Sequence, residues 1–269
     1  MSAVCQRLGT SRAAYYKRAR VLAHRRACDM LVSALVMGQR REMPRLGGRK
    51  LYHLLGGQLA GHGVRMGRDR LFAWLRSRGL LVEPKKRYCR TTHSSHRFRV
   101  YTDLVKGRPA ARPDQVWVSD ITYLRTREGF CYLALVTDAY SRKVVGWDVS
   151  RSLELEGCMR AVAMACAGRE GGHGTVHHSD RGTQYCSHAY TGYLRENGIA
   201  ISMGEAGNCY DNAMAERVNG ILKGEFNLDR TFFDLRSARR ATQQAIQTYN
   251  DKRPHMALDM RKPSELYAA

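Results

Sequence analysis

Three carboxylates have the residue types and surroundings of a site that acts on phosphodiesters. Asp120 lies within QVWVSDITYL, an otherwise apolar run in which a charge is costly unless it faces a cleft or a metal. Asp180 ends the short run Thr175–Ser179, and open sheets bind ligands at the carboxyl ends of their strands. Glu216 lies in DNAMAERVNGILKGE, which reads as a helix. A lone aspartate of this kind is usually a turn residue or a helix cap, so only the three carboxylates together indicate a site.

The predicted helix that carries Glu216 has a polar face. Glu216, Asn219, Gly220 and Lys223 are spaced i, i+3, i+4 and i+7, so they share one side of the helix. Glu216 and Lys223 are about 10.5 Å apart along the axis at 1.5 Å per residue. A carboxylate and an ammonium at that separation can hold a metal and a nearby phosphate. The alternative for this face is a solvated polar stripe.

Carboxylates that are brought together repel one another unless cations neutralise them. Hard oxygen ligands favour magnesium, which shares phosphate oxygens of its substrates. Two such ions, roughly 3.5–4 Å apart, activate an attacking hydroxyl and stabilise the leaving oxygen of a phosphodiester. The residues alone therefore predict a metal-dependent phosphodiester enzyme.

The charge of the chain is concentrated in its first part. The 269 residues carry 45 Lys and Arg against 24 Asp and Glu, a formal net charge of +21. Residues 1–100 hold 23 of the basic and 4 of the acidic residues, which leaves 22 and 20 for the remainder. This asymmetry predicts a basic nucleic-acid-binding segment joined to a differently built domain.

The basic segment, residues 1–82, is predicted to be helical. A short helix, a turn at Gly9-Thr10 and a second helix capped by Ser11 extend to Arg20, and a further helix covers Arg20–Gly38. Gly48–Ala60 and Arg68–Leu80 form another amphipathic pair. Both units resemble a helix-turn-helix, with a structural helical hairpin as the alternative. The predicted DNA contacts in this region are Arg12, Tyr16, Lys17, Arg68 and Arg70.

Residues 83–112 read as a polar, basic linker, and residues 113–269 as a catalytic core with a helical tail. Three strands come first, followed by helix, strand, helix, strand and helices, which predicts an α/β fold with a mixed sheet covered by helices. The expected strands are Gln115–Leu124, Phe130–Thr137, Lys143–Val149, Thr175–Ser179 and Ile199–Met203. The expected helices are Leu153–Ala167, His188–Asn197, Tyr210–Gly224 and Leu235–Asn250.

Several motifs in order resemble the second-frame product of transposases of insertion sequence family three, in the retroviral-integrase-like DDE superfamily. They are WVSDITY, YLALVTDAYSRKVVGW, HSDRGTQY, GNCYDNAMAERVNGILKGE and YNDKRPHMAL, and they span most of the chain. The 35 residues between Asp180 and Glu216 match the family's spacing, and Lys223 falls where the family keeps a basic residue.

The resemblance implies a ribonuclease H-like core in which Asp120, Asp180 and Glu216 are the catalytic residues and hold two magnesium ions, with Mn²⁺ as a substitute. It implies cleavage of the element's ends by water and strand transfer by the exposed 3′-hydroxyl. Lys223 would contact DNA near the cut end. Asn219, like Asn212, would help to position the site and is also a predicted DNA contact. Arg181 and Gln184, beside Asp180, are weaker candidates for phosphate contacts.

The expected partner is double-stranded DNA, both the element's terminal inverted repeats and the target. Pairing two ends implies a homo-multimer on DNA, and the resemblance adds the first-frame product of the same element as a candidate partner. Since Met1 lies close to the first helix and no sustained heptads occur, the chain is expected to be part of a fused active form.

Two other readings remain open: a DNA-binding regulator that performs no chemistry, and a plain nuclease. The apolar stretches are too short to span a membrane. The eight scattered cysteines form no CxxC pair, which favours reduced cytosolic thiols. The resemblance implies a bacterial, cytoplasmic protein that associates with the nucleoid.

Overall fold

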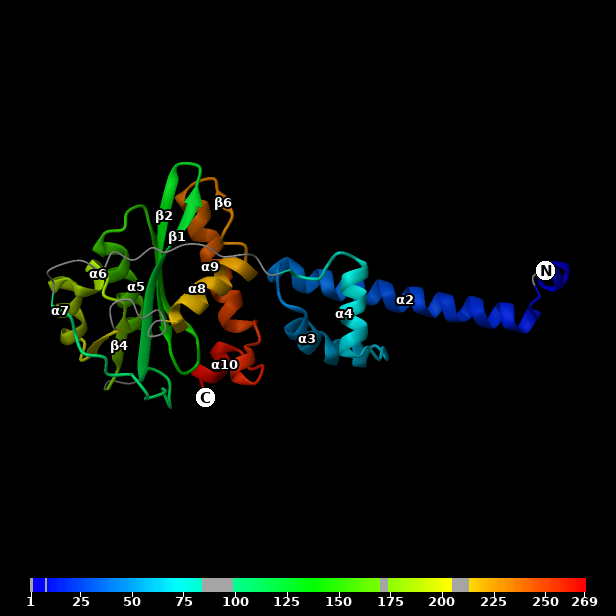
Figure 1. The fold of residues 1–269 in the computed structure, drawn as a ribbon, viewed down its shortest axis with the longest axis horizontal. Coiled ribbons are helices and arrows are strands. Elements are labelled where there is room, and N and C mark those ends of the chain that lie inside the picture. Colours follow the sequence, from blue (N-terminus) through cyan, green and yellow to red (C-terminus); the bar gives the residue numbers. More distant parts are fainter. Residues whose placement is uncertain (1, 8, 84–98, 170–173, 205–212) are drawn as a thin grey trace. The chain divides into compact units, whose positions relative to one another are not determined.

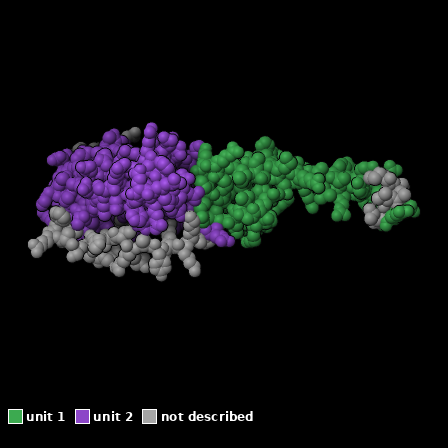
Figure 2. All heavy atoms as spheres, turned by 90° about the horizontal axis from the view of Figure 1, so that it is seen from above, with its two compact units in different colours: residues 1–82 green, residues 83–269 purple. Residues whose placement is uncertain are grey.

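The computed structural model describes residues 2–7, 9–83, 99–169, 174–204 and 213–269. The chain divides into two compact units, residues 1–82 and residues 83–269 (Figure 2). The linker motifs at residues 84–98 and the start of the Glu216 helix at residues 210–212 lie outside the described residues. Each unit is considered by itself below.

The first unit contains the helices α1 (Ser2–Arg7), α2 (Arg12–Glu42), α3 (Gly48–Gly61) and α4 (Arg68–Ser77). The Ser11 hydroxyl caps α2 by accepting a hydrogen bond from the Ala14 N–H at 3.0 Å. The predicted helix end at Arg20 is wrong, because α2 continues without interruption through Arg20 to Glu42. Residues 12–37 contain neither glycine nor proline, so nothing in this segment breaks the helix.

The α3–α4 pair confirms the expected second pair of amphipathic helices. Leu51 and Leu55 of α3 and Leu71 and Leu75 of α4 are fully buried. They form the apolar core of this unit together with Val32 and Val36 of α2. Because only the second half of α2 contributes buried residues, the residues from Arg12 to Arg26 are exposed.

A mixed sheet lies at the centre of the second unit (Figure 1). Its strands are β1 (Val116–Thr126), β2 (Gly129–Asp138), β3 (Val144–Ser150), β4 (Val176–Ser179), β5 (Ala200–Met203) and β6 (Thr231–Phe232). The order is β3-β2-β1-β4-β5, with β6 paired to β1. The first three strands are antiparallel, whereas β4 and β5 run parallel to β1. The expected mixed sheet is therefore confirmed.

Helices cover both faces of this sheet (Figure 1). One face carries α5 (Leu155–Ala167), α6 (Thr183–Cys186) and α7 (His188–Glu196). The other carries α8 (Ala213–Glu225) and α9 (Leu235–Asp251), and the tail ends in the 3-10 helix η1 (Met256–Leu258) and α10 (Pro263–Tyr267). The short elements α6, β6, η1 and α10 were not expected from the sequence, since two to five residues show no measurable periodicity.

The helix α5 packs directly on the backbone of β3 at Gly146. A Cβ atom built on Gly146 would lie 2.0 Å from the Ala161 carbonyl oxygen and 3.0 Å from the Ala165 N–H nitrogen. Backbone atoms cannot rotate away, so this contact requires glycine. This close approach holds α5 against the sheet. The helices α6 and α7 pack on the same face beside it.

The substitution Gly146→Ala is therefore expected to lower the free energy of unfolding of the second unit by about 3 kcal/mol or more, because overpacking displaces α5. Gly192→Ala in α7 is the matched control, since a Cβ there meets nothing within 4 Å. The control should be neutral or slightly stabilising. Urea unfolding followed by tryptophan fluorescence measures both, and equal midpoints for the two variants would contradict the packing described for α5.

Candidate active site

Two neighbouring parallel strands bring Asp120 and Asp180 together. Ser119 of β1 pairs with Ser179 of β4, and each aspartate follows its serine directly. Neighbouring strands lie about 4.8 Å apart, so the two carboxylates belong to one site. Beyond this point β1 is paired on the same edge with β6, at Arg125 and Thr126. Residues 120–124 thus form an interval of β1 between its two parallel partners.

Hydrogen bonds fix the orientation of both carboxylates. The side chain of Asn219 on α8 donates to Asp120 Oδ2 at 2.8 Å, and the Ile121 N–H donates to Asp120 Oδ1 at 2.9 Å. The Gly182 N–H donates to Asp180 Oδ1 at 3.0 Å. A Cβ on Gly182 would lie 3.1 Å from that same oxygen, so the absence of a side chain leaves room for the carboxylate.

Burial makes the charged forms of these carboxylates unfavourable. Burial, and then the charge of Asp180, raises the pKa of Asp120 to about 7, and Glu216 adds a smaller effect in the same direction. Burial also raises the pKa of Asp180, although the hydrogen bond from Gly182 opposes this. Within the described part of the chain, neither aspartate forms a salt bridge with a lysine or arginine.

Glu216 lies near this pair but not in close contact with it. It is exposed on the first turn of α8, three residues before the buried Asn219. The described residues contain no group of three or more acidic, histidine or cysteine side chains close enough to hold one metal ion. The two aspartates are therefore adjacent in the structure, whereas Glu216 affects Asp120 electrostatically from a longer distance.

The donor set suits a hard divalent cation. Two half-buried carboxylates supply oxygen atoms, which Mg²⁺ prefers, and they repel each other when both are ionised. The Asn219 Oδ1 atom is buried and has no hydrogen-bond partner among the described residues. Asp120, Asp180 and this amide oxygen are therefore candidate oxygen ligands for a cation.

The two histidines before Asp180 are structural. Both are buried, so neither is open to a ligand in the site. His177 Nε2 lies 2.7 Å from Ser119 Oγ and 2.9 Å from the Tyr190 hydroxyl, so it links β1, β4 and α7. Burial lowers the pKa of His177 to about 3, so this ring is neutral. No local pattern indicates this network, because its members are 58 and 13 residues apart along the chain.

Other acidic and basic residues near the motifs form salt bridges with one another. Asp148 pairs with Arg160, at 2.8 Å, and with Arg239, and so connects β3 to α5 and α9. Arg253 pairs with Glu225, at 2.8 and 2.9 Å, and joins the tail to α8. These residues stabilise the fold around the site.

The residues expected to contact phosphates beside Asp180 are also engaged. Arg181 donates to the Gly204 carbonyl oxygen at 2.8 Å, and Gln184 donates to the Leu153 carbonyl oxygen at 2.6 Å. Lys223 on α8 has its ammonium nitrogen 4.3 Å from the centre of the Tyr123 ring. Whether these three side chains contact DNA stays a prediction.

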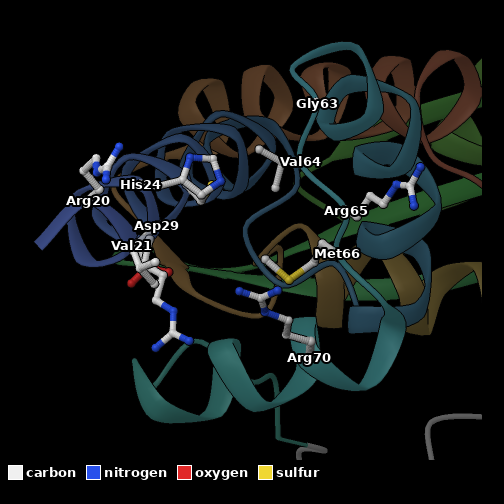
Figure 3. A pocket seen from close by; sticks show the side chains of 11 residues that line it. Arg20, Val21, His24, Asp29, Gly63, Val64, Arg65, Met66 and Arg70 are labelled. Carbon is white, nitrogen blue, oxygen red and sulfur yellow. The ribbon is translucent and has the colours of Figure 1, made fainter. Parts of the chain in front are cut away.

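A basic pocket of about 840 Å³ lies in the first unit, between α2, the α3–α4 connection and α4 (Figure 3). Its lining includes Arg20, Arg25, Arg65 and Arg70, with Asp29 as the acidic member. The expected contacts Arg12, Tyr16 and Lys17 are exposed on α2, outside the residues that line this pocket. Arg68 is exposed and pairs with its neighbour Asp69 at 2.8 Å.

Comparison with known proteins assigns these features to a family. Two family models described as Integrase core domain match residues 110–209 and 197–263. An uncharacterised 31 kDa protein of insertion element IS600 from Shigella sonnei is 32% identical over 97% of this chain and 96% of its own length. The transposase of IS629 from the same organism is 36% identical over 77% and 70%, and transposase InsF of IS3A from Escherichia coli is 33% identical over 84% and 78%.

The solved structures agree in fold. An intasome structure of simian T-cell lymphotropic virus has a TM-score of 0.52 and 18% identity, over 83% of this chain and 75% of the viral chain. The likeness supports the integrase-like, ribonuclease H-type fold expected from the motifs. None of the helices in the described segments is long and apolar enough to cross a membrane.

The closeness of the two carboxylates should make the free energy of unfolding depend on pH and on divalent metal. Because folding raises the pKa of Asp120 from its ordinary 3.8 to about 7, its stabilising contribution is complete below pH 4 and lost as the pH rises through 7. In chelator, the free energy of unfolding should fall by roughly 2–4 kcal/mol between these limits. Asp120→Asn should flatten this dependence.

Mg²⁺ at pH 8 should then raise the melting temperature of the wild-type protein and have little effect on Asp120→Asn, because one ligand is missing. Thermal unfolding at several pH values, with and without Mg²⁺, measures both effects. An equal response of Asp120→Asn and the wild type to Mg²⁺ would show that Asp120 is not a metal ligand.

Proposed function

The chain belongs to the transposases of insertion sequence family three, and on this premise we propose that Asp120, Asp180 and Glu216 hold the divalent cations with which it cuts and joins DNA. The protein is a transposase with a DDE-type integrase core, a polynucleotidyl transferase, and no finding supports the reading as a regulator without catalysis. One observation carries the assignment of the site: two half-buried aspartates lie side by side on neighbouring parallel strands, with no basic side chain paired to them among the described residues.

The residues of the chain have separable roles in this proposal. Asp120 and Asp180 supply the fixed ligands, and Glu216 supplies the third from α8. Asn219 orients Asp120 through Oδ2, so it is a positioning residue. The Gly182 N–H orients Asp180 in the same way. When bound, two Mg²⁺ ions, or Mn²⁺ in their place, would neutralise the carboxylates, activate the attacking hydroxyl and stabilise the leaving oxygen.

The first unit is proposed to hold the DNA of the element's ends. Its basic pocket has the charge to bind phosphates, and the exposed basic residues of α2 extend this surface. Since joining uses two ends and a target, we propose that several copies assemble on double-stranded DNA, which would locate the protein at the nucleoid. The first-frame product of the element is proposed as a further partner.

Asp180→Asn is expected to retain DNA binding and to lose strand transfer by at least a hundredfold, because one fixed metal ligand becomes a neutral amide. Glu216→Gln should have the same effect. The assay uses purified full-length protein, Mg²⁺ and labelled DNA that carries the element's terminal repeats.

Matched controls are Asp251→Asn and Glu156→Gln, which neutralise exposed acidic residues of α9 and α5. Both controls should join DNA like the wild type. Joined products from Asp180→Asn at the wild-type rate would refute the site assignment, whereas cleavage without joining by the wild type would favour a plain nuclease.

Neutralising the basic surface of α2 should reduce the salt dependence of DNA binding. The double substitution Arg12→Ala and Lys17→Ala is expected to lower the slope of log K against log salt concentration by about 1.8, since each phosphate contact contributes about 0.9. Arg240→Ala is the comparison, because it removes an exposed basic residue of α9 that is not among the predicted DNA contacts. An unchanged slope for the double variant would mean that this part of α2 makes no phosphate contacts.

A further inference from the structure

One face of the β1–β2 hairpin carries aromatic rings and arginines in alternation. We define the aromatic–arginine face as Tyr123, Arg125, Arg127, Phe130 and Phe233. Residues 123 and 125 of β1 point to the same side, and Arg125 pairs directly with Phe130 of β2. The strand β6 lies beside this end of the hairpin (Figure 1), and its pairing with β1 brings Phe233 to the same place.

The rings of this face are held by contacts with one another and with cations. The Tyr123 and Phe130 rings are 5.2 Å apart in an edge-on arrangement. The Arg127 guanidinium carbon lies 5.1 Å from the centre of the Phe233 ring, and that of Arg125 lies 5.9 Å from the Phe130 ring. These distances are those of cation–π interactions, which pre-arrange the arginines beside the rings.

Two of these rings are exposed to solvent, although apolar side chains of this size are usually buried. Phe130 is 54% exposed and Phe233 is 66% exposed. Both are phenylalanines, which gain most from burial and have no polar atom to direct toward water. Their exposure on a small patch that is rich in arginine marks a binding surface.

The aromatic–arginine face adjoins the candidate active site. Tyr123 lies three residues beyond Asp120 on β1, so the two side chains leave opposite faces of the strand. Both belong to the interval that separates the pairing of β1 with β4 from its pairing with β6. The Lys223 ammonium over the Tyr123 ring comes from α8, one turn beyond Asn219. Lys223 therefore connects α8, which orients Asp120 through Asn219, to the Tyr123 ring of the aromatic–arginine face.

A ligand for this face must offer flat faces to the rings and negative charge to the arginines. Unpaired nucleotides offer both, because their bases stack on aromatic rings and their phosphates pair with arginine. Paired bases of a duplex are stacked on one another and offer no free face. We propose that the aromatic–arginine face binds unpaired bases of the DNA strand that enters the active site, an inference that rests on the proposed function.

The charge of the region favours nucleic acid over a protein partner. The basic residues of these segments are Arg125, Arg127, Arg230 and Lys223, and the acidic ones are Glu128, Glu225, Asp229 and Asp234. Glu225 pairs with Arg253 and Asp234 caps α9, so these two charges are already engaged within the chain. Glu128 is moreover 3.8 Å from Arg151. A protein partner would have to be acidic at this position, and the experiment below includes that outcome.

The test compares two DNA duplexes in metal-free buffer, one fully paired and one with three unpaired bases at its end. The wild-type protein is expected to bind the unpaired end about tenfold more tightly, as measured by fluorescence anisotropy. The double variant Phe130→Leu and Phe233→Leu should lose this preference, whereas Phe130→Trp, which keeps a ring, should retain it. Met256→Ala is the matched control, an exposed apolar side chain in the tail.

Since Phe130 and Phe233 are exposed, the variants should unfold at the wild-type midpoint. Quenching of a 2-aminopurine at the unpaired end by the wild type, and not by the double leucine variant, would support stacking. No preference in the wild type, or the same preference in the double variant, would overturn the inference. So would a loss of self-association in place of a loss of DNA preference, since that result indicates a protein interface.

Strand transfer in Mg²⁺ separates this inference from the proposed function. Joining by the wild type together with unchanged DNA preference of the double variant would overturn the aromatic–arginine face alone. Failure of the wild type to join DNA would contradict the proposed function, whatever the face binds.

Discussion

The repulsion between Asp120 and Asp180 is the constraint on which the rest of the second unit depends. Both carboxylates are half-buried, and desolvation together with the neighbouring charge raises the pKa of Asp120 to about 7. A fold that holds two such groups together loses stability at neutral pH unless cations compensate. Their placement, within β1 and directly after β4, therefore fits a site that a divalent metal completes.

The surroundings hold this arrangement in place. The neutral His177 network links the two strands from the α7 side, and Asn219 fixes Asp120 from the α8 side. Beyond the site, the short strand β6 pairs with the same edge of β1. Residues 120–124 of β1 thus lie between the two pairings, and the aromatic–arginine face lies next to them.

The sequence predicted the sheet and the paired aspartates because strand patterns and motifs are local. Asp120 was recognisable as a charge in an apolar strand, and Asp180 as the residue that ends another. The prediction of a helix end at Arg20 was wrong, because α2 is unbroken from Arg12 to Glu42. The lack of glycine and proline in residues 12–37 indicates a single helix. The aromatic–arginine face was beyond sequence reasoning, since Phe233 joins Phe130 only through a two-residue strand.

The position of a bound metal ion shows whether Asp120 and Asp180 form a metal site. Crystals of the protein soaked in Mn²⁺ at pH 8 would show the ion by its anomalous scattering. The account predicts a peak in contact with carboxylate oxygens of both Asp120 and Asp180, which disappears in Asp120→Asn. Mn²⁺ bound elsewhere in the protein, with no peak between these two aspartates, would contradict it.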